Sequence, residues 1–289
     1  MNQPSAWSKT RTNRMIECEI AFCKEYSYFQ KPTKQKIRTP WEIMLYCSRN
    51  SITNYLKNLN AKRNKYLHHS IYENLERMIR KQSEQNNILL KTREIKLQNT
   101  SRNIPFIDEK MVLKLTNYSK KRVSSFLQIP LIEELTREHT SWHLLDNLSL
   151  SYHEGAQIYS APNLIIESKN KIRLITFQIQ GSVSPSNAYG VTHGNLIWAI
   201  ENEFLPDESE IYSSEIYSWS GSGWDIINEQ LDETAIKSFK SVILKDIENM
   251  DYLLAEYKQN RISNLKVPES KLICKRCRYL DFCSYSILD

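Results

Sequence analysis

The sequence lacks the features that mark several common classes of protein. No stretch approaches the roughly 18 consecutive apolar residues that a membrane-spanning helix needs, and the first residues (MNQPSAWSKTRTNR) contain no apolar segment of the kind found in secretory signals. The chain has no glycine-rich phosphate loop, no dinucleotide-binding fingerprint and no Ser/His/Asp arrangement. These absences predict a cytoplasmic protein that makes no membrane contact and binds no nucleotide cofactor.

The composition is that of a folded protein with a moderate excess of positive charge. Of 289 residues, 40% are hydrophobic and 16 are tyrosine, which indicates a globular chain of one large or two closely associated domains. Lys and Arg number 39 against 33 Asp and Glu, a formal net charge of +6. This excess favours polyanions such as nucleic acid as partners, although a solvated lysine-rich surface has the same composition.

The cysteines lie only near the two ends of the chain. Cys274, Cys277 and Cys283 form a C-x2-C-x5-C pattern, whereas Cys18, Cys23 and Cys47 lie near the N-terminus. Disulfides are not expected in a reducing cytosol, so the clustered thiols indicate a metal site, for which the N-terminal cysteines can supply a fourth ligand. Buried free cysteines acting as small hydrophobic residues are the alternative interpretation. Spacing alone does not choose between zinc and an iron–sulfur cluster.

The pattern of apolar residues predicts an α/β core that follows a helical region. Apolar positions three and four apart predict helices over residues 41–60, 71–90, 187–205 and 232–260. Residues 157–168 and 171–182 are β-branched runs on either side of a polar turn, and residues 209–224 predict a further strand. Within residues 91–140, which are rich in Lys, Arg, Asn and Ser, only 131–138 predicts a helix.

The two ends of the chain together resemble the iron–sulfur branch of the PD-(D/E)XK nucleases, the RecB-like family that includes CRISPR-associated RecB-type exonucleases and AddB-like subunits. The similarity lies in residues 7–11 (WSKTR), in Cys18, in the aromatic residues that follow it (Phe22, Tyr26, Tyr28 and Phe29) and in the cysteine tail. The resemblance implies a [4Fe-4S] cluster held by Cys18, Cys274, Cys277 and Cys283. Cys23 is the rival of Cys18 as first ligand, and Zn²⁺ is the alternative metal.

The resemblance also implies a fold and a division of the chain. The fold is α/β, with a PD-(D/E)XK-like mixed central sheet flanked by helices. The implied segments are an N-terminal segment that supplies one cluster ligand (1–40), a helical insertion (41–140), a RecB-like nuclease core (141–262) and a cysteine-cluster tail (263–289).

The positions that carry catalysis in the family are altered in this chain. The Gly-x-x-Asp element corresponds to residues 160–163, which read SAPN and place Asn163 at the metal-binding position. The Asp/Glu-x-Lys element corresponds to Phe177 and Ile179, and the upstream His falls near Asn50 or Ser51. The Gln-x-x-x-Tyr helix keeps its Tyr189 and loses its Gln. Because Mg²⁺ and Mn²⁺ need carboxylate ligands, neither ion is expected to bind.

Two functions follow from this comparison. The preferred one is a catalytically inactive RecB-like homologue that binds nucleic acid, DNA being favoured, or scaffolds protein partners in a CRISPR, antiviral defence or recombination complex. The alternative is an active metal-dependent DNA exonuclease with a migrated site formed by His153, Glu154, Glu167 and Lys169, in which Glu167 and Lys169 make a Glu-x-Lys pair. A charged Glu-x-Lys in a turn is more often ordinary solvated surface.

Overall fold

The computed structural model describes residues 6–27, 37–61, 67–96, 104–146, 149–229, 233–277, 279–280 and 283–287. Several of its helices begin at capping residues that the sequence offers. At the start of α3 (Pro40–Asn60) the Thr39 hydroxyl accepts a hydrogen bond from the Glu42 N–H, and the Glu42 carboxylate accepts one from the Thr39 N–H. Ser184 caps α7 (Pro185–Ile200) in the same position before a proline.

The other elements follow in chain order. The remaining helices are α1 (Lys9–Glu17), α2 (Glu19–Tyr26), α4 (Leu67–Lys96), α5 (Glu109–Phe126), α6 (Pro130–Thr136), α8 (Glu233–Lys258), α9 (Lys271–Arg276) and the 3-10 helices η2 (Ser209–Ile211) and η3 (Ile262–Asn264). The strands are β1 (Ser141–Leu144), β2 (Ser151–His153), β3 (Ala156–Ile158), β4 (Leu164–Ser168), β5 (Lys171–Gln178), β6 (Tyr212–Trp219) and β7 (Trp224–Glu229). The helices predicted around α3, α4, α6, α7 and α8 and the strands predicted around β4, β5 and β6 are confirmed.

The central sheet is mixed and mostly antiparallel, with the strand order β1-β4-β5-β6-β7. Only β5 and β6 run parallel, in a register that places Leu174 opposite Ser214, and α7 makes the crossover between them. Strands β2 and β3 form a separate antiparallel hairpin. The predicted α/β class, with a mixed central sheet flanked by helices, is confirmed at this level, whereas the division into four segments remains a prediction.

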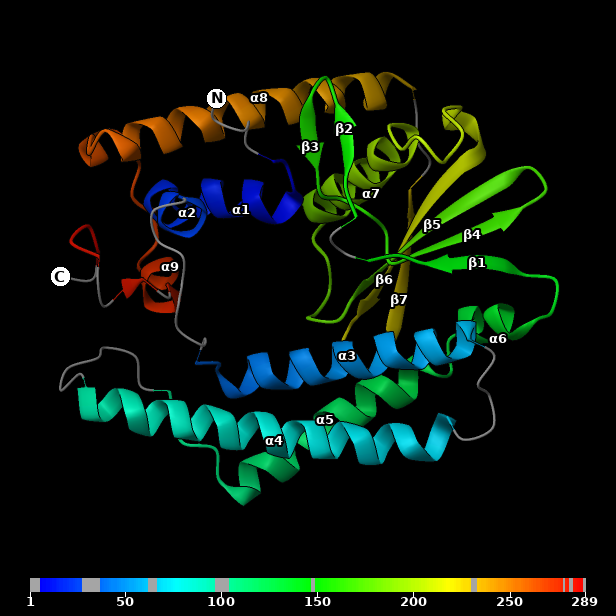
Figure 1. The fold of residues 1–289 in the computed structure, drawn as a ribbon, viewed down its shortest axis with the longest axis horizontal. Helices are drawn as coiled ribbons and strands as arrows, with labels where there is room; N and C mark the ends of the chain where they lie inside the picture. The colour runs from blue at the N-terminus through cyan, green and yellow to red at the C-terminus, as the bar shows by residue number, and fades with distance from the viewer. Residues whose placement is uncertain are drawn as a thin grey trace.

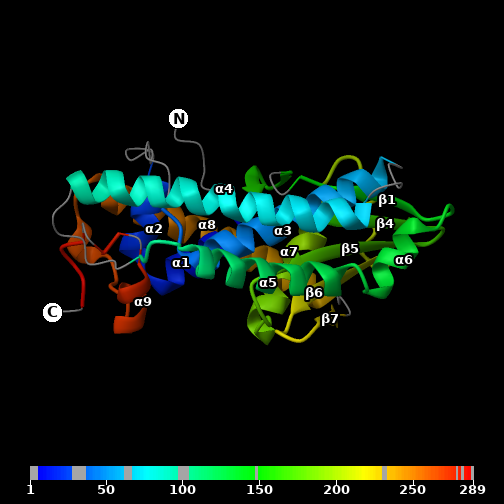
Figure 2. The ribbon, with the colours of Figure 1, turned by 90° about the horizontal axis from the view of Figure 1, so that it is seen from below.

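The two faces of the sheet belong to two hydrophobic cores. Successive residues of a strand point to opposite faces, so Leu174 packs with α1, α2, α7 and α8 while Ile175 packs with α3, α4, α5 and α6. Figure 1 shows these two helical layers on opposite sides of the strands, and Figure 2 shows α3, α4 and α5 lying side by side. The sheet therefore holds the α1–α2 region and the α3–α6 layer in fixed positions.

Helix α5 was not predicted, and the expectation of a single helix within residues 91–140 is wrong. Asp108 caps α5, accepting a hydrogen bond from the Met111 N–H at 2.7 Å. The buried residues of the helix recur every three or four positions, although its lysines dominate the composition of the segment. This stripe consists of Val112, Leu115, Thr116, Ser119, Arg122, Val123 and Phe126. The polar composition of the segment therefore hid a helix that the spacing of these buried residues indicates.

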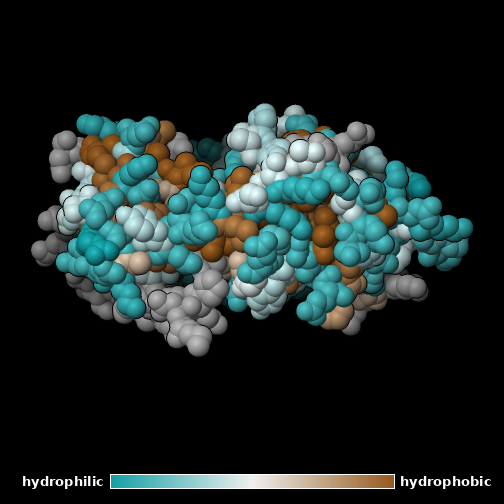
Figure 3. All heavy atoms as spheres, turned by 90° about the horizontal axis from the view of Figure 1, so that it is seen from above, coloured by the Kyte–Doolittle hydropathy of each residue, from teal (hydrophilic) through white to brown (hydrophobic). Residues whose placement is uncertain are grey.

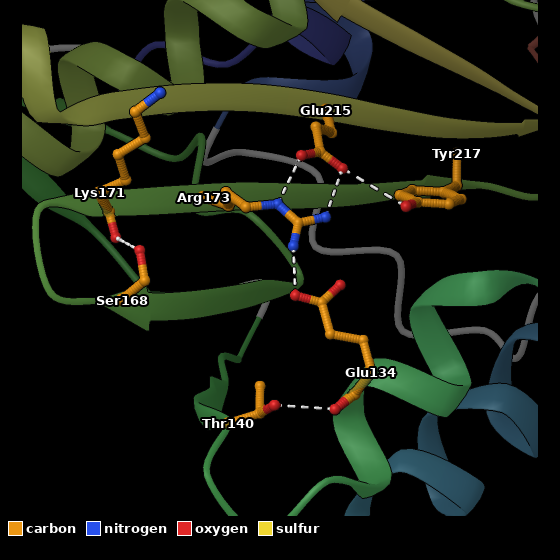
Figure 4. Close-up of polar contacts among 7 residues, drawn as sticks. All are labelled: Glu134, Thr140, Ser168, Lys171, Arg173, Glu215 and Tyr217. Carbon is orange, nitrogen blue, oxygen red and sulfur yellow. Dashed lines mark hydrogen bonds and ion pairs between the residues drawn. The ribbon is translucent and has the colours of Figure 1, made fainter.

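A network of charged side chains joins α6 to the sheet. The Arg173 guanidinium on β5 donates from Nε and Nη2 to the two carboxylate oxygens of Glu215 on β6, at 2.6 and 3.0 Å, and from Nη1 to Glu134 on α6 at 2.5 Å (Figure 4). Tyr217 donates to Glu215 at 3.4 Å. These bonds to Glu215 and Glu134 raise the pKa of Arg173, so the cation stays charged at every pH at which the protein folds.

No helix in the described part of the chain is long and apolar enough to cross a membrane. The face over α8 is mainly hydrophilic, with hydrophobic side chains gathered in small, separate areas (Figure 3). Val242 and Tyr252 are the exposed large hydrophobic residues of α8. Scattered apolar residues of this kind are ordinary on a protein surface.

Candidate functional site

The N-terminal segment is anchored before it reaches its cysteine. The Trp7 indole N–H and the Thr12 hydroxyl donate to the same carboxylate oxygen of Asp246 on α8, at 3.0 and 2.8 Å. The Trp7 main chain bonds to β3 through Gln157 and Tyr159, at 2.8 Å each. Helix α1 is therefore held against α8 and the β2–β3 hairpin. Tyr28 and Phe29, part of the family resemblance, lie outside the described residues.

Cys18 occupies the break between α1 and α2. Its backbone is extended, its N–H closes α1 by donating to the Arg14 carbonyl at 3.1 Å, and its sulfur accepts the Ala21 N–H at 3.4 Å. The Cys18 sulfur therefore acts as the N-cap of α2. The same residue lines a pocket together with the cysteines of the C-terminal tail.

The tail is brought to this turn by contacts with α8 and α2. After α8, Arg261 and Asn264 bind the carboxylate of Glu256 and turn the chain back, the Asn264 amide at 2.7 Å. The Lys266 N–H then donates to the carboxylate of Glu19 on α2 at 2.7 Å. Helix α9 consequently lies beside α1 and α2, as both ribbon views show (Figures 1 and 2).

Thiols from both ends of the chain meet in one small pocket. Cys18, Cys274, Cys277 and Cys283 all line it, together with mainly apolar residues of α2 and the tail that include Ile20, Ala21, Ile273 and Leu280. Cys18, Cys274 and Cys277 are buried and Cys283 is half-buried. The structure thus brings together the four cysteines that the resemblance names as ligands.

Two charge effects act on these thiols. Burial raises the pKa of Cys18 and the hydrogen bond from the Ala21 N–H lowers it; the neighbouring Cys277 and Cys283 thiols raise it further. The Arg14 guanidinium opposes this effect and lies 3.7 Å from the Cys277 sulfur. A bound metal cation would remove the repulsion by accepting the thiolates as ligands.

The pocket has the donors for a metal, but the thiols stand apart from one another. Among the described residues, no three His, Cys, Asp or Glu side chains are arranged as around a bound ion, and the pocket that the four cysteines line has a volume of about 20 Å³. A single zinc ion needs less room than a four-iron cluster. Four thiols in an apolar lining suit either group.

The other two cysteines are isolated from this pocket. Cys23 lies on the inner side of α2, where its thiol donates to the Leu253 carbonyl at 3.4 Å, and Cys47 lies in the second core under α3. Burial raises the pKa of each thiol to about 12. Both therefore behave as small buried hydrophobic residues, and the rival position Cys23 does not line the pocket.

Three residues that the resemblance matches to catalytic positions, Asn163, Phe177 and Ile179, lie together at a second site, between α3 and the ends of β1, β4 and β5. The Asn163 amide oxygen accepts the Phe177 N–H at 2.6 Å, and the Asn163 main chain bonds to Ile175 and to Leu145. Asn163, Phe177 and Ile179 line a cavity of about 300 Å³. The residue aligned with a metal-binding carboxylate thus uses its oxygen to join two strands.

The remaining family positions lie elsewhere. Ser51 is buried and lines a different cavity, between α3 and α4. Tyr189 on α7 stacks on the ring of His193, with 3.8 Å between ring centroids, on the opposite side of the sheet from α3. Neither residue contributes a side chain to the cavity that Asn163 lines.

The residues of the migrated site fall into two separate pairs. His153, at the end of β2, contacts Glu201 at 3.0 Å and Glu154 at 3.9 Å, and Glu201 also binds Lys240 at 2.5 Å. Glu167 and Lys169 lie at the β4–β5 turn, where Glu167 contacts His143 at 3.6 Å. Figure 1 shows the β2–β3 hairpin beside α8, well away from that turn. No contact between described residues joins the two pairs.

Four polar residues of the cavity were missed from the sequence: Arg49, Thr53 and Lys57 on α3, and Asp146 after β1. The signal for the first three was available. They recur every fourth residue, so they share one face of a helix that is otherwise largely buried. Asp146 gave no such signal, because only the sheet brings the end of β1 to this place.

The comparisons with known proteins leave the family open. No family model matches the chain, and no curated protein and no solved structure matches it.

Proposed function

We propose that this chain is a nuclease-derived subunit that has lost cleavage activity, binds nucleic acid, with DNA favoured, and is clasped by a [4Fe-4S] cluster on Cys18, Cys274, Cys277 and Cys283. The resemblance to RecB-like nucleases suggests the setting, a CRISPR, defence or recombination complex in which the chain also contacts protein partners.

One observation supports the proposed cluster most directly: four cysteines from opposite ends of the chain line the same pocket. Small hydrophobic residues have no reason to be cysteine at all four places, whereas a metal centre requires it. When bound, the cluster would join the two ends of the chain and reduce the conformational entropy of the unfolded state. Its role would therefore be structural. Arg14 would lie next to one of its thiolates.

Loss of cleavage is supported by the chemistry of the second cavity. Of the described residues that line it, only Asp146 carries a carboxylate, and the positions aligned with the family's ligands hold Asn163, Phe177 and Ile179. A nuclease that uses Mg²⁺ or Mn²⁺ needs several hard oxygen ligands and a lysine beside the attacking water. The cavity offers too few such ligands.

Metal analysis of anaerobically purified protein tests the cluster. We expect about four iron and four sulfide ions per chain and a broad visible absorption from thiolate-bound iron. A measured content of one zinc ion per chain and no iron would show that the same cysteines hold zinc instead of the cluster. Protein that contains neither metal would reject the proposed centre.

Incubation with DNA tests the loss of activity. Purified protein with Mg²⁺ or Mn²⁺ is expected to leave single- and double-stranded DNA uncut, because the carboxylate pair is missing. Cutting abolished by Glu167→Ala would instead establish the migrated site. Cutting abolished by Asp146→Ala, but not by Glu167→Ala, would place an active site in the second cavity.

A further inference from the structure

The second cavity has an unusual charge for a place aligned with a metal site. Its polar lining contains two cations, Arg49 and Lys57, against the single carboxylate of Asp146. Neither cation makes an ion pair with any residue that the structure describes, and both are exposed to solvent. A metal site has the opposite balance, so this cavity is suited to an anion.

The cations are spaced along one face of α3. Arg49 and Lys57 are two turns apart, about 12 Å along the helix axis, and Thr53 lies between them with a hydroxyl that can donate to an anion. An arginine can bind a phosphate through two parallel hydrogen bonds, and lysine adds a point charge. Together they form a phosphate-binding edge along the cavity.

The wall of the cavity facing this edge is apolar. The apolar residues that the strands and their ends contribute are Leu144, Leu145, Phe177 and Ile179, and α3 adds Ile52 and Leu56 beside the cations. The Phe177 ring is half-buried and is held by an edge-to-face contact with Phe126, with 5.0 Å between ring centroids. A ring fixed in this way is a rigid surface for a flat ligand. The ligand should therefore combine negative charge with a planar apolar part.

We propose that this cavity binds one nucleotide unit of a single-stranded nucleic acid without a metal ion, with the phosphates on either side of that nucleotide at Arg49 and Lys57 and its base against Phe177. A volume of about 300 Å³ is at the lower end for small-ligand sites, which fits one nucleotide and excludes a duplex. The inference rests on the nucleic-acid part of the proposed function. It adds where the nucleic acid binds, that the bound form is single-stranded and that binding needs no metal ion.

The test compares two double variants of the full chain that remove equal charge. Binding of fluorescein-labelled dT12 is measured by anisotropy at several salt concentrations in EDTA. Arg49→Gln with Lys57→Gln is expected to weaken binding roughly tenfold or more, and to reduce the slope of log affinity against log salt by about 1.4, the value for two phosphate contacts. Lys81→Gln with Lys91→Gln, two exposed positions on α4, is the matched control and should change little.

A third variant tests the base contact. Phe177→Leu keeps an apolar wall but removes the aromatic ring, so it should weaken dT12 binding several-fold and leave the salt slope unchanged. Thermal unfolding of each variant verifies that it is folded. Wild-type affinity in Phe177→Leu would overturn the placement of the base. An rU12 probe assigns the source of the nucleotide, DNA or RNA, by whichever strand binds more tightly.

The outcomes separate this inference from the proposed function. If the wild type binds dT12 and the Arg49/Lys57 variant binds as well, or if the α4 control loses as much, the cavity is not the site while nucleic-acid binding stands. A requirement for Mg²⁺ would also overturn the inference. If the wild type binds neither strand even at low salt, the nucleic-acid part of the proposed function fails with it, and a protein-interaction module remains.

Discussion

Replacing Cys277 with serine is expected to remove the bound iron and the visible absorption, and to lower the free energy of unfolding by about 5 kcal/mol. The magnitude is that of cross-linking residues separated by hundreds of positions, because the proposed cluster would join Cys18 to the tail and restrict the unfolded chain. A serine hydroxyl is a poor ligand for iron, so the closure is lost. Iron analysis and anaerobic denaturant unfolding measure the two effects on the same preparation.

Two other cysteines serve as controls. Cys23→Ala and Cys47→Ala remove buried sulfur atoms outside the pocket, so each should cost on the order of 1 kcal/mol and keep the iron. Loss of iron in Cys23→Ala would make Cys23 the N-terminal ligand in place of Cys18. A Cys277→Ser protein with wild-type iron and stability would contradict the proposed centre.

Replacing Arg173 with methionine is expected to lower the free energy of unfolding by about 3 kcal/mol, the lower end of the range for breaking a buried ion pair. The substitution leaves two carboxylates, Glu215 and Glu134, near each other without their cation. The side chains of Arg173, Glu215 and Glu134 keep 26, 14 and 32% of their exposure, so water moderates the cost. Denaturant unfolding near neutral pH measures the change.

Arg122→Met is the matched control for this prediction. Arg122 is also buried, but in the described part of the chain its guanidinium meets no carboxylate and lies instead over Trp41 and Trp219, at 4.9 and 5.3 Å from the ring centroids. Burial lowers the pKa of Arg122. Because cation–π contacts contribute about 2 kcal/mol and desolvation of the charge costs several, the free energy of unfolding should be unchanged or higher. Equal destabilisation in both variants would mean that packing, not charge, sets the effect of Arg173→Met.

Local signals in the sequence were sufficient for most elements of the fold. Periodic apolar residues located α3, α4, α7 and α8, and two β-branched runs around a polar turn located β4 and β5, because these patterns depend on neighbours within a few positions. Helix α5 was missed, since its lysines and serines hid the stripe from Val112 to Phe126. The cysteine pattern predicted that an N-terminal thiol would meet the tail, and the family resemblance favoured Cys18 over Cys23, which agrees with the pocket that Cys18 lines.

The sequence alone determined the class of the fold and the identity of the thiols, because helix periodicity, strand alternation and cysteine positions can be read along the chain. Tertiary structure alone decided which residues from distant parts of the chain lie in contact. Asp246 fixes the N-terminal segment, Glu19 holds the tail, and the sheet brings Asp146 and Phe177 to the cavity that Arg49 also lines. These contacts join residues far apart in the chain, and no local preference specifies them, since they arise only when two layers of helices pack on the two faces of one sheet.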